Sequence, residues 1–433
     1  MAHETHDVTE VPLRRLERVP GAVRLTTLGL LGVGIVALIA AFLTDPARAW
    51  RAYLFNWLFW TTIAQGAVVF AVAITMTRGI WGRSIRRIAL SFVLFVPISF
   101  LLMLPLFFAG DSIFTWIGQE MHGSRAAYLN LPFLAVRNIV AMGVLSALSL
   151  WYAYWALRPD LALHRDDVPR GLQGLYDRML RGWRGFEEER ELAAHRLSVI
   201  GPIIGLVWAV AFSFVAWDLV MTLEEDWWST LIGPYVFMGG FLGGVAATAL
   251  LTVVYRAKLG LEKAIQPPQF HDLGKLTFAF CIFWGYLLWA QYIVMWYGNL
   301  PREQVYLLHR MAEPYIGLSL VVFLFLFVVP FFGLLGVAPK KRPTLLALFS
   351  SVVLVGLWIE RYILIYPTFY HDNGELVLSW PEVGMALPFA GLFLASLIAF
   401  ATRFPVLQAW DGPADVNLLE TIAEAEGGEV VTY

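Results

Sequence analysis

Long apolar segments alternate with short polar ones along most of the chain. Each segment has about twenty or more residues, enough to cross ~30 Å of hydrocarbon as a helix. They are too long and too continuous for the strands of a membrane barrel. The expected spans are residues 24–44, 52–77, 87–110, 130–157, 197–222, 229–255, 274–298, 312–337, 344–366 and 383–403. The pattern predicts an all-α polytopic membrane protein with about ten transmembrane helices.

Composition supports this class. Of the 433 residues, 59% are hydrophobic and 15% are charged, whereas soluble proteins carry roughly 25% charged residues. The single cysteine, Cys281, lies in an apolar run, and we interpret it as a packed structural thiol. The sequence has neither a nucleotide-binding loop nor a zinc motif, and we expect no nucleic-acid partner and no metal site.

The distribution of basic residues predicts the orientation. Most of the 31 Lys and Arg residues lie in the N-terminal segment and the even-numbered loops, and such an excess marks the cytoplasmic side. The opposite loops are acidic, with Glu224, Glu225, Asp226, Asp372 and Glu375. We therefore expect both termini in the cytoplasm. The chain divides into an N-tail (1–23), four spans (24–157), a cytoplasmic segment (158–196), six spans (197–404) and an acidic tail (405–433).

The segment 158–196 has a helical pattern of its own. Large apolar residues recur on one stripe between Gly171 and Arg196, with Arg and Glu filling the remaining positions; they are Leu172, Leu175, Tyr176, Met179, Trp183 and Phe186. This pattern is typical of an amphipathic helix on the membrane surface. It would shield the ends of the spans or dock a partner subunit.

Ionisable residues inside a bilayer are functional candidates by default. Those in the predicted spans, or at the start of the eighth span, gather toward the outer side: Asp218, Glu360, Arg361, Arg137, His309, Glu313 and the amide Gln291. We interpret them as one polar cluster that handles protons or a polar head group, with Asp218 at its rim as a proton gate. The alternative is ion pairing between helices, with Asp218 or Glu360 neutralising Arg137.

The ionisable residues have two further features. Glu360 and Arg361 are adjacent and point about 100° apart on a helix, so we expect each to pair with another helix. A second polar set, His271, Asp272 and His195, lies at the predicted cytoplasmic mouth.

The chain is not expected to hold a redox centre. None of its eight histidines lies deep in a predicted span, and one cysteine cannot ligate an iron–sulfur cluster. We assign no catalytic residue, and electrons would have to come from a quinol or from a partner subunit.

Aromatic and small residues are placed as in other membrane proteins. Trp227 and Trp228 follow the acidic turn, where interfacial aromatic belts are common. Gly239-Gly240-x-x-Gly243-Gly244 is a stripe of small residues that favours close helix contact.

Several segments resemble a known family. They are Trp217-Asp218-Leu-Val-Met-Thr-Leu-Glu224 with Trp228-Ser-Thr-Leu-Ile-Gly-Pro-Tyr, His271-Asp272-Leu-Gly-Lys275 with Gln291-Tyr292 and Trp296-Tyr297-Gly-Asn299, and Leu308-His309-Arg310. They resemble the F subunit of alternative complex III, the bacterial quinol:electron acceptor oxidoreductase. That subunit belongs with the polysulfide-reductase-like (NrfD-like) membrane subunits. The resemblance covers roughly spans two to nine.

The resemblance implies two four-helix bundles plus two peripheral helices in the bacterial inner membrane. It implies three kinds of partner: a homologous NrfD-like quinol-binding membrane subunit, an iron–sulfur periplasmic subunit and c-type haem subunits. Haem and iron–sulfur clusters would reside only in those partners, and a quinone such as menaquinone is the one cofactor this chain could hold. Carboxylates of the family are associated with proton conduction, and Asp218 matches that position; Glu360-Arg361-Tyr362 is closer to the pattern of the sister subunit.

The sequence is therefore compatible with three functions. The first is a quinone- and proton-handling subunit of an electron-transfer complex. The second is a structural scaffold of the same complex, and the third is a stand-alone transporter. Transporters often place their substrate at broken helices, and the prolines of spans three and eight do not make a convincing pair.

Overall fold

The computed structural model describes residues 14–165, 168–224 and 227–410. Helices make up nearly all of this part of the chain, which contains no strand. Ten helical segments within it are long and apolar enough to cross a membrane. The chain is therefore an all-α multi-pass membrane protein, as its hydropathy predicts.

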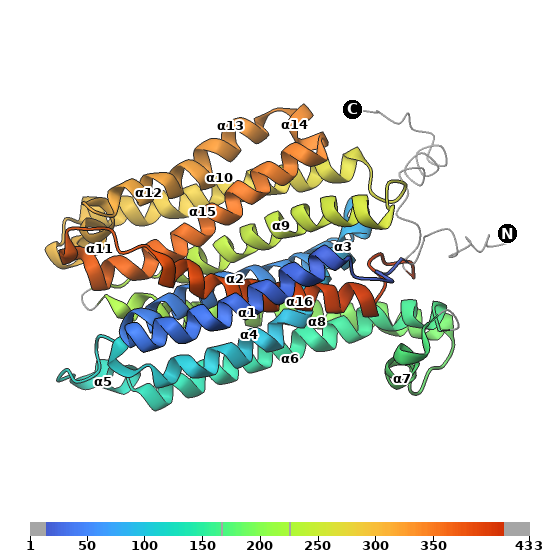
Figure 1. Ribbon diagram of the computed structural model, residues 1–433, viewed down its shortest axis with the longest axis horizontal. Coiled ribbons are helices and arrows are strands. Elements are labelled where there is room, and N and C mark those ends of the chain that lie inside the picture. The colour runs from blue at the N-terminus through green and yellow to red at the C-terminus, as the bar shows by residue number, and fades with distance from the viewer. Residues whose placement is uncertain (1–13, 166–167, 225–226, 411–433) are drawn as a thin grey trace.

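The spanning helices lie side by side along the long axis of the molecule (Figure 1). They are α1 (Gly21–Thr44), α2 (Pro46–Met76), α3 and α4 (Arg83–Leu90 and Phe95–Met103), α6 (Leu131–Leu163), α8 (Phe186–Leu219), α9 (Ile232–Leu259), α10 (Pro267–Gly298), α12 and α13 (Ile316–Phe323 and Val329–Leu335), α15 (Pro343–Tyr370) and α16 (Trp380–Arg403). Short helices cap the ends: α5 (Gly123–Tyr128) and α11 (Pro301–Met311) at one end, α7 (Arg170–Met179) and α14 (Val337–Lys341) at the other. We call these the α11 end and the α7 end.

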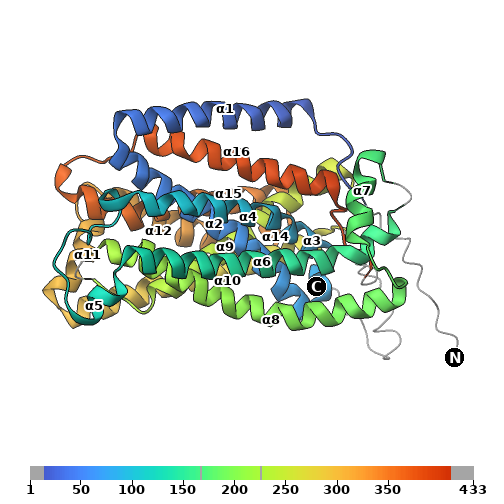
Figure 2. The same ribbon diagram turned by 90° about the horizontal axis from the view of Figure 1, so that it is seen from below.

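The helices form two bundles of four spans and a peripheral pair. The first bundle consists of α2, α3–α4, α6 and α8, and the second of α9, α10, α12–α13 and α15. The remaining spans, α1 and α16, pack on each other, and α16 packs on α2 (Figure 2). Of the ten spans, α2 is the most buried and α1 the least.

A stripe of small residues brings the two bundles together. A Cβ atom on Gly244 of α9 would lie 2.2 Å from the Ala67 backbone nitrogen of α2, and one on Gly66 would lie 2.2 Å from the Gly240 carbonyl oxygen. Neither position has room for a side chain. The glycine stripe of α9 is therefore a helix contact, as predicted, and it sets the closest approach of the bundles.

Two spans are irregular. The third contains the 3-10 turns η3 (Ser91–Leu94) and η4 (Leu104–Phe108), and the eighth contains the π-helical turn η7 (Leu324–Val328), immediately before Pro330. Proline removes a backbone donor, which explains a widened turn at this place. The eighth span continues in one direction through its π-helical turn (Figure 1).

The segment 158–196 does not form the single surface helix that the sequence predicts. Two glycines with positive φ, Gly182 and Gly185, interrupt the predicted helix after α7, and α8 then starts at Phe186 and continues into the membrane. Arg158 of α6 holds this junction through an ion pair with Glu189 of α8, at 2.7 Å. The Tyr176 hydroxyl donates to the Arg403 carbonyl oxygen, so α7 packs on the end of the bundle.

Both ends of the described chain meet at the α7 end. Leu16 N–H donates to the Ala401 carbonyl oxygen, and Val406 N–H donates to that of Arg14. The first residues of the predicted acidic tail are buried, and the amides of Ala409 and Trp410 donate to Asp160, which also pairs with Arg87. The acidic residues of the predicted tail from Asp411 onward, like most of the predicted N-tail, lie outside the described residues.

Candidate functional site

The predicted polar cluster divides into two groups with separate partners. The first surrounds Asp218, near the end of α8. Its carboxylate is fully buried and accepts hydrogen bonds from Arg137 Nε at 2.6 Å, from Asn138 and from the Tyr128 hydroxyl at 3.1 Å. Asp218 therefore neutralises Arg137, which is the alternative that the sequence left open.

This first group is closed by its own contacts. The Arg137 guanidinium lies 3.8 Å from the centroid of the Tyr128 ring and also donates to the Tyr128 carbonyl oxygen. Burial, and then the Asp218 charge, raise the pKa of Tyr128 to about 12, so its hydroxyl remains a donor at neutral pH. The arrangement resembles a seal between α5, α6 and α8 more than the rim of an open cluster.

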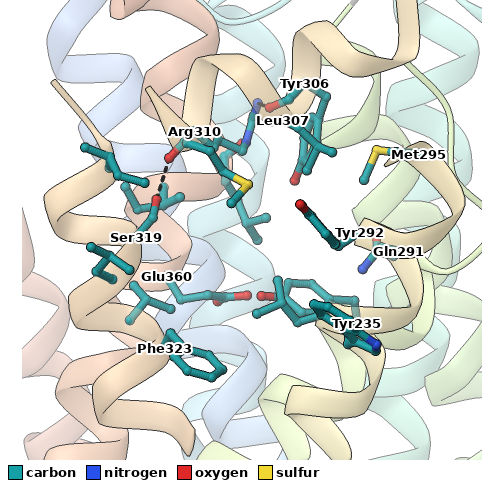
Figure 3. Close-up of a pocket in the computed structure, with 18 of the residues that line it drawn as sticks. Tyr235, Gln291, Tyr292, Met295, Tyr306, Leu307, Arg310, Ser319, Phe323 and Glu360 are labelled. Carbon is teal, nitrogen blue, oxygen red and sulfur yellow. Dashed lines mark hydrogen bonds between the residues drawn. The ribbon is translucent and has the colours of Figure 1, made fainter. Parts of the chain in front are cut away.

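The second group lines a cavity of about 490 Å³ in the second bundle. Figure 3 shows it between α9, α10, α11, α12 and α15. Its polar lining residues are Tyr235, Gln291, Tyr292, Tyr306, Arg310, Ser319 and Glu360, and the rest of the wall is apolar or aromatic. Five large apolar lining residues are exposed: Trp289, Trp296, Met311, Leu320 and Phe323. The cavity can therefore be reached from the apolar phase around the helices.

Glu360 lies on the cavity wall and pairs with its neighbour in sequence. Arg361 Nη1 is 2.9 Å from Glu360 Oε2, and Arg361 Nη2 donates to the Val236 carbonyl oxygen. The expectation that these two residues pair with other helices is thus wrong for the ion pair, because the long Arg361 side chain folds back to its neighbour. The Tyr235 hydroxyl points toward the Glu360 carboxylate on the same side of the cavity (Figure 3).

Arg310 lies on the opposite wall, near the α11 end (Figure 3). Its guanidinium packs 3.6 Å from the centroid of the Tyr306 ring and donates to the carbonyl oxygens of Tyr306 and Leu364. Its Nε is buried and has no hydrogen-bond partner among the described residues. A buried charged donor without a partner is costly, and Arg310 is one of the residues that line the cavity.

Behind Arg310, Glu224 links its own segment to α11 and α15. Its carboxylate lies 3.4 Å from Arg310 Nη1 and 3.2 Å from His309 Nδ1, and it accepts a hydrogen bond from Thr368 at 2.9 Å. Despite the burial of this carboxyl, His309, Arg310 and Thr368 lower its pKa to about 2. Glu224 is therefore a buried anion and not part of an exposed acidic turn; Glu225 and Asp226 lie outside the described residues.

The other predicted residues fall in different places. His309 and Arg310 belong to α11, which ends before the eighth span begins at Ile316, and Glu313 is exposed in the turn between them. Gln291 lines the cavity. At the α7 end, Asp272 pairs with Lys275 of its own helix at 2.6 Å, and His195 is exposed on α8. Cys281 is buried and free, as predicted.

Sequence reasoning missed the aromatic residues of the cavity. Trp227 is buried and stacks on Tyr306 with ring centroids 3.6 Å apart, whereas only Trp228 is exposed as an interfacial residue would be. Tyr235 and Tyr306 carry no charge and belong to no motif, so the sequence does not distinguish them from aromatic residues at the membrane interface. Spacing along α10 is the one available signal, since Trp289, Tyr292 and Trp296 recur on one face and stack in series.

No protein-family model and no curated protein matches this chain.

Proposed function

We propose that the chain is an integral membrane subunit of a bacterial quinol-oxidising complex of the alternative complex III type, and that its second bundle binds a quinone. The observation that carries this proposal is the cavity between Glu360 and Arg310. It combines an apolar wall open to the membrane with a carboxylate on one side and an unpaired N–H donor on the other. Pockets for small ligands are typically ~300–1,000 Å³ with few polar groups.

These groups suit the head group of a lipid-soluble quinone such as menaquinone. A quinone ring carries oxygen atoms on opposite sides and is otherwise flat and apolar. Arg310 Nε would donate to one oxygen, and Glu360, facing Tyr235, would accept the proton of the other when the ring is in its reduced form. The ladder of Trp289, Tyr292 and Trp296 offers flat surfaces at the opening.

In the proposed complex this chain handles the ligand and its protons, and partners handle the electrons. Haem and iron–sulfur groups in partner subunits would supply the electron transfer. In this orientation the α11 end faces the outside and the α7 end, with its Arg and Lys residues, faces the cytoplasm. The homologous quinol-binding subunit, the iron–sulfur subunit and the c-type haem subunits are the expected partners.

The second candidate is a structural scaffold of the same complex. Asp218 and Glu360 each form an ion pair with an arginine, and buried pairs of this kind can serve packing alone. The two candidates differ in one respect: a scaffold has no reason to bind a quinone in the cavity.

The test is quinone binding by the full-length chain in lipid nanodiscs. We would titrate menadione and follow the quenching of tryptophan fluorescence. Leu320→Trp fills the opening while every polar group stays in place, and Leu335→Trp, on the same span but away from the cavity, is the matched control. We expect Leu320→Trp and Tyr235→Phe to weaken binding by about tenfold or more, as the loss of about 1.4 kcal/mol implies. Equal affinity in Leu320→Trp and Leu335→Trp would overturn the pocket.

Membership of a complex needs its own measurement. A tag on this chain should co-purify c-type haem, detected by its absorbance in native membranes solubilised in mild detergent. Isolation of the chain alone, active in moving a solute, would support a transporter instead.

A further inference from the structure

Two histidines outside the cavity stack face to face at the α11 end. The rings of His309 on α11 and His371 on η8 (His371–Asn373) have centroids 3.6 Å apart and planes 15° apart. Neither histidine lines the cavity. The pair is therefore not explained by the pocket, although Arg310, the neighbour of His309, lies on the cavity wall.

Each ring has a carboxylate of its own. His309 Nδ1 lies 3.2 Å from Glu224 Oε1, and His371 Nε2 lies 3.3 Å from Asp372 Oδ2. His371 Nδ1 is 3.1 Å from the Pro367 carbonyl oxygen, so this nitrogen is placed to keep its proton as a donor. Among the described residues, the charged groups around the pair are Glu224, Asp372 and the Arg310 guanidinium, which itself pairs with Glu224.

These four side chains form a graded series from interior to surface. The exposed fraction of the side chain rises from 9% in Glu224 to 17% in His309, 33% in His371 and 91% in Asp372. A proton on His309 is held next to a buried anion, and a proton on His371 is held next to an exposed one. Two protonated rings in this stack would place like charges at van der Waals contact, where they repel strongly.

We propose that His309 and His371 form a single-proton exchange site, in which one ring at a time is protonated. When His309 takes a proton from water onto Nδ1, on the side of Glu224, His371 gives up the proton on its Nε2 to water beside Asp372. In the reverse step His371 takes a proton from water and His309 releases one to water, so neither direction changes the charge of the pair. The site has no electron to transfer, so it needs no oxidant or reductant.

The use of this site for protons from the cavity rests on the proposed function. Arg310 contacts both places, and because it stays charged it orders Glu224 without passing the proton itself. The proton-binding behaviour of the pair does not depend on a quinone, so it can be tested on its own.

The experiment counts protons. The full-length chain in nanodiscs is titrated from pH 8 to pH 5, with His309→Gln, His371→Gln and the double variant compared with the wild type. A shared site takes up about one proton with both rings or with either ring present, and none when both are replaced. We therefore expect each single variant to match the wild type and the double variant to bind about one proton fewer.

His122→Gln calibrates the measurement. His122 is exposed at the same end of the molecule, and the change in proton count that its replacement causes is the reference for the counts of the paired histidines. Thermal unfolding of each variant confirms that it is folded. Loss of about one proton in each single variant and about two in the double variant would show independent histidines and overturn the proposal. No loss in any of them would overturn it as well.

The link to the cavity has a separate readout. In the isolated complex, His371→Gln should shift the pH dependence of quinol-driven turnover, while His122→Gln should leave it unchanged. An unchanged profile alongside the expected proton counts would leave the site in place and remove its connection to the cavity. Failure of menadione binding would instead count against the proposed function alone.

Discussion

Replacing Arg137 by methionine separates a structural role of Asp218 from a role in proton conduction. Asp218 is completely buried, and Arg137 provides two of its hydrogen bonds, one of them from Nε at 2.6 Å. The variant leaves a buried carboxylate with Asn138 and Tyr128 as its remaining donors. Hydrogen bonds to charged groups contribute ~1.5–3 kcal/mol each, and removing one partner of a buried ion pair costs about 3–5 kcal/mol.

The double variant Arg137→Met/Asp218→Leu is the comparison for the single variant Arg137→Met. It removes both charges, and replacement of a whole buried pair by apolar side chains is often close to neutral. We expect its free energy of unfolding to lie closer to the wild type than that of Arg137→Met, with a coupling energy of about 2–3 kcal/mol. Asp111→Asn, an exposed carboxylate at the same end, is the control for the loss of one negative charge.

The assay is reversible unfolding in mixed micelles with increasing dodecyl sulfate, followed by circular dichroism. A change below about 1 kcal/mol in Arg137→Met would refute the argument, because no buried pair could then have been broken. Lower quinol-driven proton release in Asp218→Asn, at unchanged stability, would restore Asp218 as a proton-conducting group. The pairing of Asp218 with Arg137 predicts the opposite result, namely lower stability and unchanged turnover per folded complex.

Three further predictions use the same unfolding assay. Glu224 has a pKa of about 2 in the folded chain, so its ionised form stabilises the fold above the unfolded pKa near 4.5. Lowering the pH from 7 to 3 should reduce the free energy of unfolding by about 2 kcal/mol through this group. Glu224→Gln should remove this contribution to the pH dependence of stability. Gly244→Ala should cost about 1–3 kcal/mol by overpacking, whereas Gly205→Ala, with nothing within 4 Å, should cost nothing. Ending the chain at residue 403 removes the backbone donors of Asp160 and should cost about 2–4 kcal/mol, whereas ending it after Trp410 keeps them and should not.

Hydropathy predicts the fold because lipid imposes a simple requirement on the chain. Every backbone polar group in the membrane must be bonded within the segment, so long apolar runs can only be helices. Helix ends at the α7 end are less predictable, since α8 begins at Phe186, eleven residues before its apolar run. The first turns of α8 are charged, so hydropathy predicts a loop there. The ion pair between Arg158 and Glu189 stabilises these turns as helix.

The positions of the site residues are only partly contained in the sequence. Charges inside spans are rare, and this rarity is enough to single out Asp218, Arg137 and Glu360 from the sequence alone. Their partners depend on helix rotation and side-chain reach, which a single sequence does not give. Arg361 illustrates this, because the helical angle separates it from Glu360 and its flexible side chain still closes the distance to 2.9 Å.

The buried charges around Asp218 and those around Glu360 have different surroundings, and this difference is why we propose a ligand for the second bundle. In the first bundle, Asp218 is surrounded by donors from Arg137, Asn138 and Tyr128, and the apolar groove of about 530 Å³ beside the pair is lined by Arg137 but not by Asp218. In the second, Glu360 faces a cavity and the Nε of Arg310 has no partner in the described chain. Neutral substitutions should therefore change stability in the first group and ligand affinity in the second.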